Sequence, residues 1–217
     1  MSGSICFTET LRGQLAAPQP AAGTVLALMD LQVALDAALP RGMAGVQGRI
    51  IQGCLQASWL CPQALTVLEG RVEILRQTAA NSCEMRYDLL CAAPPGVAVF
   101  GGGSLLRVLG VKDVSHHSGY RWPRALWVET TRLRLDLYAV AGAVVPADIF
   151  KQLPASPAQP LASGVVRIHG AGFVRQLLSL RSHSPQGRWQ ALRNLLGFLR
   201  FFVARLARVY GGTHARA

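Results

Sequence analysis

The sequence predicts a mainly β fold, an antiparallel sandwich or barrel followed by a pair of amphipathic helices. Residues 127–138 carry the longest β-type pattern, with Leu133, Leu135 and Leu137 alternating with Arg132, Arg134 and Asp136. Alternation of period two places one set of side chains on a core and the other toward water. Similar stretches recur along the first 140 residues and are separated by turn residues, and this spacing is typical of an antiparallel sandwich or barrel.

Local patterns predict the other elements. One helix is expected over 31–38, because its apolar residues follow a helical spacing between Asp30, a suitable N-cap, and Pro40. A break is expected at Cys61-Pro62 and a polar loop over 112–120. The predicted strands cover residues 4–15, 24–28, 46–56, 65–75, 85–91, 97–100, 105–109, 127–138 and 165–168.

A change in composition predicts the domain organisation. Residues 146–163 contain four prolines and indicate a surface linker between a β domain, 1–145, and a C-terminal region, 164–217. In the C-terminal region, helical spacing of apolar residues predicts helices over 172–180 and 187–210. We expect both helices to pack on or beside the β domain.

The positive charge is concentrated in the C-terminal region. The net charge is +11, and residues 164–217 hold nine arginines and no acidic residue. The first 163 residues keep 13 basic and 11 acidic residues, a net charge of +2. Any electrostatic attraction to an anionic partner is therefore expected from the C-terminal helices.

The helix over 187–210 has a broad apolar face and a basic face. The apolar face is expected to include Trp189, Leu192, Leu195, Leu196, Leu199, Phe202, Val203, Leu206 and Tyr210. Arg193, Arg200, Arg205 and Arg208 occupy the other face, with Phe201 among them. Either the basic face is only solvated, or it docks on an anionic membrane or an acidic partner. Nucleic-acid binding is not expected, because neither a helix-turn-helix nor an aromatic and basic sheet pattern is present.

Sequence motifs do not indicate catalysis. There is no G-x-S-x-G elbow, no phosphate-binding loop and no dinucleotide-binding fingerprint. Asp113, His116 and His117 share one loop but lack a fourth ligand, so we expect no metal site. Glu9 and Glu129 lie in the two best predicted strands and are expected to be solvated or hydrogen-bonded. We therefore predict a protein without catalytic residues, metal or cofactor.

The cysteine pattern predicts a reducing, cytoplasmic setting. The five cysteines form no C-x-x-C pair, and no charged-then-apolar leader precedes residue 5. No apolar run of about 18 residues predicts a membrane-spanning helix. A peripheral position on the inner face of a membrane is compatible with the cationic helix.

Several motifs, in the same order along the chain, resemble one known family. They are FTETLRG at 7–13, LTV at 65–67 through Gly70, MRY at 85–87, WVETTRL at 127–133, GVVRI at 164–168, FVRQL at 173–177, FLRFF at 198–202 and VYG at 209–211. Together they are similar to the accessory region that follows the flavin domain in long, cholesterol-oxidase-like glucose–methanol–choline (GMC) oxidoreductases. Glu129 and Arg132 depart from the family's W-x-D-T-T-T-L pattern, and a lysine expected near residues 101–103 is absent.

Two functional hypotheses follow. The resemblance implies a noncatalytic accessory module that works with a lipid- or sterol-oxidising flavoenzyme, or another lipid enzyme. The basic face of the C-terminal helix, with Arg193, Arg200, Phe201, Arg205 and Arg208, would dock the module on that partner or on a membrane. The alternative is a lipid or sterol carrier with a cavity inside the β domain. That cavity would be lined by Trp59, Met85, Tyr87, Trp127 and Leu133, whereas a solid core is the competing expectation.

Overall fold

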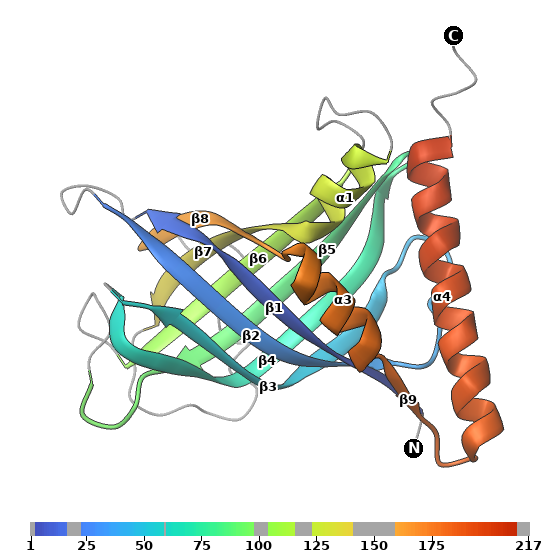
Figure 1. Ribbon diagram of the computed structural model, residues 1–217, viewed down its shortest axis with the longest axis horizontal. Coiled ribbons are helices and arrows are strands. Elements are labelled where there is room, and N and C mark those ends of the chain that lie inside the picture. Colours follow the sequence, from blue (N-terminus) through green and yellow to red (C-terminus); the bar gives the residue numbers. More distant parts are fainter. Residues whose placement is uncertain are drawn as a thin grey trace, which may run out of the picture.

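The computed structural model describes residues 3–16, 23–58, 60–97, 104–115, 123–140 and 159–211. Within these ranges, eight antiparallel strands close into a barrel in the order β1 to β8, and a ninth strand pairs with the start of β1 (Figure 1). The predicted sandwich or barrel is thus a barrel. Its strands are β1 (Ser4–Ala16), β2 (Thr24–Asp36), β3 (Val46–Ala57), β4 (Cys61–Ala79), β5 (Ser82–Ala92), β6 (Leu105–Val114), β7 (Arg132–Val140) and β8 (Ala162–Arg167).

Alternating side chains fill the barrel. In β1, Ile5, Phe7, Leu11 and Leu15 are buried and point inward, and Glu9 occupies the same inward register. The residues between them are half-buried or exposed on the outer wall. This period-two pattern explains why the alternation of the sequence located most strands correctly.

The barrel closes at the seam between β1 and β8. Gly13 lies opposite Val166, and Leu15 lies opposite Gly164. A Cβ atom on Gly13 would come within 2.0 Å of the Val165 carbonyl oxygen, and one on Gly164 within 2.1 Å of the Gln14 carbonyl oxygen. The two glycines therefore permit an approach of the strands that any larger residue would block.

Three helices of the described chain lie at one end of the barrel. They are α1 (Arg124–Thr131), α3 (Gly170–Ser179) and α4 (Arg188–Gly211), and β9 (Arg181–His183) connects α3 to α4. In Figure 1, α3 lies beside β1 and α4 stands across the end of the barrel where β1 begins. The C-terminal helices predicted from the sequence are both present.

The segment 127–131 is a helix, so the strand predicted over 127–138 is wrong in its first part. The backbone turns helical after Pro123, and the hydroxyls of Thr130 and Thr131 donate hydrogen bonds of 2.6 Å to the Leu126 and Trp127 carbonyl oxygens. Packing of the helix on β6 overrides the β propensity of Trp, Val and Thr, and the hydrogen bonds satisfy the two threonine hydroxyls within the helix. The strand β7 begins only at Arg132.

The helix predicted over 31–38 is also wrong. Residues Leu31, Val33 and Leu35 are buried in β2, which pairs along this stretch with both β1 and β3. A spacing of four residues fits one face of a strand as well as one face of a helix, and the two neighbouring ladders decide for the strand. The predicted break at Cys61-Pro62 is the start of β4, and Lys112 belongs to β6 rather than to a loop.

The C-terminal region contributes to the barrel. The strand β8 pairs with both β7 and β1, so the boundary predicted at residue 163 falls inside a barrel strand. Residues 146–158 of the predicted linker, and 98–100 of a predicted strand, lie outside the described ranges. None of the helices that the structure describes is long and apolar enough to cross a membrane.

Candidate ligand-binding site

An apolar cavity of about 630 Å³ lies at the end of the barrel where β1 and β5 begin and β6 ends. We call it the mouth cavity. Its barrel wall consists of inward-facing side chains, namely Phe7 of β1, Ile74 of β4, Met85 and Tyr87 of β5 and Lys112 of β6. These strands converge here because Met85 lies opposite Lys112 in the β5–β6 ladder. The barrel interior is thus hollow at this end and packed solid farther in, where Leu11, Leu89 and Leu106 are completely buried.

The helices form most of the rest of the mouth cavity. From α1 come Arg124, Leu126, Trp127 and Thr130, from α3 Phe173, Gln176 and Leu177, and from α4 Phe198, Leu199, Phe202 and Leu206, with Pro123, Ile168 and Leu180 beside the helices. The rings of Trp127 and Phe173 meet edge to face, with centroids 5.1 Å apart and planes at 81°. This contact joins α1 to α3 over the barrel and supports one side of the cavity.

A buried ion pair lies beneath the apolar walls. Glu9 and Lys112 are only 1% and 2% exposed, and the Lys112 ammonium donates to Glu9 Oε1. The Tyr87 hydroxyl donates to Glu9 Oε2 over 2.9 Å, and the ammonium lies 5.3 Å from the centre of the Tyr87 ring. Both carboxylate oxygens are engaged, and so the cluster of Glu9, Lys112 and Tyr87 is internally neutral and hydrogen-bonded.

The environment keeps Tyr87 protonated. Burial raises the pKa of Tyr87 well above its usual value, and the neighbouring Glu9 charge and the hydrogen bond to Glu9 raise that pKa further. At neutral pH the phenol is therefore a fixed hydrogen-bond donor and does not serve as a base. The cluster thus holds the Tyr87 hydroxyl and the Lys112 ammonium at fixed positions on Glu9.

One polar atom of the cavity wall has no partner among the described residues. Gln176 lines the mouth cavity, and its Oε1 is shielded from solvent without accepting a hydrogen bond. A buried amide oxygen without a partner costs about 1–3 kcal/mol.

The structure brings together part of the predicted ligand-lining set. Met85, Tyr87 and Trp127 all line the mouth cavity. Leu133 is completely buried in the barrel core and is not part of the lining, and Trp59 lies outside the described residues.

The polar residues of this site were missed by sequence reasoning. Glu9 occupies an inward position between Phe7 and Leu11, so a charge in an apolar register was the available signal. Glu9 and Glu129 were expected to be solvated or hydrogen-bonded, and the second alternative holds, because both are buried and accept hydrogen bonds from tyrosines. Lys112 could not be assigned while residues 112–120 were expected to form a loop.

The predicted docking residues do not share one surface. Arg193, Arg200 and Arg208 are exposed, whereas Arg205 is only 5% exposed. The Arg205 guanidinium donates to Gln77 Oε1 at 2.5 Å and to the carbonyl oxygens of Gly42 and Ala44. It also lies 5.1 Å from the centre of the Phe201 ring, and Phe201 packs half-buried against the core. Arg205 and Phe201 therefore attach α4 to the barrel, which corrects their expected place on an exposed basic face.

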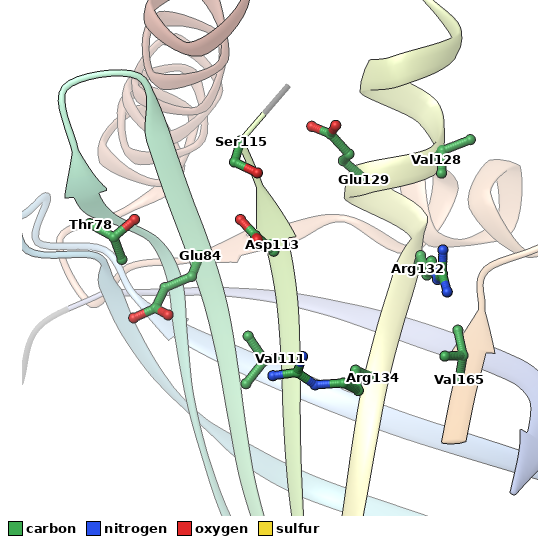
Figure 2. A pocket seen from close by; sticks show the side chains of 10 residues that line it. All are labelled: Thr78, Glu84, Val111, Asp113, Ser115, Val128, Glu129, Arg132, Arg134 and Val165. Carbon is green, nitrogen blue, oxygen red and sulfur yellow. The ribbon is translucent and has the colours of Figure 1, made fainter. Parts of the chain in front are cut away.

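A second, polar cleft of about 560 Å³ lies on the outer wall. Figure 2 shows acidic side chains from β5, β6 and α1, namely Glu84, Asp113 and Glu129, and the basic side chains of Arg132 and Arg134 from β7. Among the described residues, no group of three or more His, Cys, Asp or Glu side chains could hold a metal ion. His116 and His117 lie outside the described ranges.

Within this polar cleft, Glu129 is tied to α4. The Tyr210 hydroxyl donates to Glu129 Oε2 over 2.6 Å. Burial raises the pKa of Tyr210 above its usual value, and the hydrogen bond to Glu129 and its charge add to the increase. The pair links the end of α4 to α1, so this carboxylate is occupied by a structural contact.

Comparisons with protein-family models, with curated proteins and with solved structures find no match to this chain.

Proposed function

We propose that this protein binds a mostly apolar small molecule in the mouth cavity. The observation that carries the proposal is the cavity itself, about 630 Å³ in volume and walled by apolar side chains with a few polar groups at fixed positions. Known small-molecule sites span roughly 300–1,000 Å³ and have this kind of lining. Protein interiors are close-packed and contain few voids larger than a water molecule, so a space of this size indicates a binding site.

The polar groups favour a neutral ligand head group. Lys112 is already paired with Glu9, and Arg124, the other basic residue of the lining, also interacts within the protein, so an anionic head group would have to compete with existing partners. Gln176 also lines the cavity, and a rotation of its side chain would turn an amide oxygen that has no partner among the described residues toward the ligand. A hydroxyl can donate to it, and the ligand class that fits best is a lipid alcohol, either a sterol or a long-chain alcohol.

This proposal develops the carrier alternative drawn from the sequence. The expected association with a flavin-dependent lipid or sterol oxidoreductase remains a prediction, as does the cytoplasmic location, because no relative was found to test either. A protein that binds a lipid alcohol could serve such an enzyme by presenting or removing its substrate, so the two roles are compatible.

The test is a binding titration with a cavity-filling variant and its neighbour. Leu177 lines the cavity and is 50% exposed, whereas the adjacent Leu178 is 71% exposed and lies outside the lining. A long-chain alcohol with an environment-sensitive fluorophore is titrated into wild type, Leu177→Trp and Leu178→Trp. We expect saturable binding by wild type, a loss of affinity of about tenfold or more in Leu177→Trp, and wild-type affinity in Leu178→Trp.

Competition defines the head group in the same assay. Unlabelled cholesterol or a long-chain alcohol should displace the fluorescent alcohol more effectively than the fatty acid of equal chain length. Folded wild-type protein that gives no saturable binding, or equal losses in the two tryptophan variants, would overturn the proposed site. Stronger displacement by the fatty acid would overturn the assignment of the head group.

A further inference from the structure

The exposed face of α4 is apolar. Trp189, Leu192, Leu196, Leu199 and Val203 recur at intervals of three and four residues, and all are exposed, Trp189 by 83% and Val203 by 63%. This spacing places them on one side of the helix, and we call them the apolar stripe. The opposite side of α4 packs on the barrel through Phe198, Arg205 and Val209. The helix is thus rotated relative to the prediction from sequence, which placed most of the stripe in the core.

The apolar stripe continues across the mouth cavity onto α3. Val174, Leu177 and Leu178 of α3 are exposed by 50% or more. Leu177 and Leu199 are at once exposed and part of the cavity lining, so they mark its rim. Figure 1 shows α3 and α4 as neighbours at this end of the barrel, joined through β9. The mouth cavity therefore borders an apolar surface formed by two helices.

Arginines flank this surface. Arg193 and Arg200 are exposed and follow Trp189 and Leu196 by four residues, which places each one beside the stripe. Arg175 of α3 and Arg188 at the start of α4 are exposed as well. No acidic residue occurs from residue 164 onward to balance them. The surface thus combines exposed apolar side chains with the net positive charge of α3 and α4.

The apolar stripe and its flanking arginines favour an anionic membrane over a second copy of the chain as the partner. Two copies of the chain that met symmetrically through this face would bring the same arginines toward each other, which opposes association. A bilayer containing anionic lipids offers an apolar layer for the stripe and negative head groups for the arginines. Tryptophan and arginine at the edge of an apolar helix face are typical of helices that lie in the membrane interface.

We infer that α3 and α4 dock on an anionic membrane surface, with the apolar stripe in the interface and the mouth cavity opening toward the lipid. In this orientation a lipid alcohol passes between bilayer and cavity without crossing water. The transfer step rests on the proposed function, whereas the docking step does not. Membrane attachment runs through the stripe and its flanking arginines, and Phe201 and Arg205 stay on the barrel.

The test uses flotation with vesicles of two compositions, phosphatidylcholine alone and phosphatidylcholine with phosphatidylserine, at low and high salt. The variants are Leu196→Gln with Val203→Gln, which makes the stripe polar, and Arg193→Gln with Arg200→Gln, which removes charge. The matched control is Leu26→Gln, because Leu26 is a 76% exposed leucine on β2 and does not line the mouth cavity. All five positions are exposed, so the fold is expected to survive.

We expect wild type and Leu26→Gln to float with the anionic vesicles at low salt. The stripe variant should lose about tenfold or more in partitioning, and the arginine variant should behave at low salt as wild type does at high salt. The inference would be overturned if the wild-type protein did not float with anionic vesicles. It would also be overturned if the stripe variant floated as well as the wild-type protein. A third contrary outcome is that neither protein binds vesicles, while sedimentation shows a dimeric wild type and a monomeric stripe variant. The stripe would then be a contact between two copies of the chain.

Binding of the fluorescent alcohol in solution separates the two proposals. The stripe variant should keep wild-type affinity for this alcohol, since Leu196 and Val203 do not line the mouth cavity. Vesicle binding by a protein that binds no alcohol would leave docking standing and remove the transfer step. Alcohol binding without vesicle binding would leave the proposed ligand binding standing and remove docking, together with the transfer step.

Discussion

Two buried glutamates each accept a hydrogen bond from a tyrosine, but they have different structural roles. Glu9 lies inside the barrel, where Tyr87 and the Lys112 ammonium hold its two oxygens. Glu129 lies on α1 outside the barrel and accepts a hydrogen bond from Tyr210 of α4. The first carboxylate supports the floor of the mouth cavity, and the second ties together two of the helices that cover it.

The two carboxylates differ in what surrounds them, and a more deeply buried charge costs more free energy unless it is paired. Glu9 is only 1% exposed and requires a full counterion, which Lys112 of β6 supplies from another part of the barrel wall. Glu129 lines a cleft that also contains Arg132 and Arg134 (Figure 2). We therefore expect the inner cluster to control global stability and the outer pair to control the attachment of α4.

The largest expected effect comes from removing the counterion. Lys112→Met leaves the Glu9 carboxylate buried without a counterion and should lower the free energy of unfolding by about 3–5 kcal/mol, measured by urea denaturation. The double variant Glu9→Gln, Lys112→Met removes both charges and should recover most of that loss. A Lys112→Met protein within about 1 kcal/mol of wild type would contradict the buried ion pair.

A smaller and local effect is expected at the outer pair. Tyr210→Phe removes a hydrogen bond to a buried carboxylate and should cost about 1–3 kcal/mol. Amide hydrogen exchange should accelerate at the end of α4 and in α1, with little change in β5 and β6. Tyr138→Phe is the matched control, because no hydrogen bond of the Tyr138 hydroxyl occurs among the described residues. Equal exchange patterns in the two variants would show that the Glu129 contact does not anchor α4.

Local periodicity predicted the parts of the fold in which one face of an element meets the core. The strands containing residues 4–15, 46–56 and 85–91, and both C-terminal helices, follow from such patterns. The segment 127–131 could not be predicted, because the same Trp, Val and Thr residues suit a strand, and the packing of the helix on β6 does not show in the local pattern. Residues 31–36 were missed for the converse reason, since two neighbouring strands impose the extended backbone.

The candidate site was only partly visible in the sequence. Met85, Tyr87 and Trp127 were placed in the cavity because they are large and were expected to point inward. The rotation of α4 was not predictable, because the helix carries apolar residues on both sides. Phe198 and Val209 face the barrel, whereas Trp189 and Val203 face outward. Which side packs depends on Arg205, whose contacts with Gln77, Gly42 and Ala44 join residues far apart in the sequence.

Methyl NMR of the methionines tests ligand binding in the mouth cavity most directly. Met85 lines the cavity, Met29 is completely buried deeper in the barrel, and Met43 is 55% exposed elsewhere on the surface. On addition of a long-chain alcohol, the Met85 methyl resonance should shift with saturation while those of Met29 and Met43 stay in place. An unchanged Met85 resonance in the presence of bound alcohol, or a saturable shift of Met43 alone, would show that the ligand binds elsewhere.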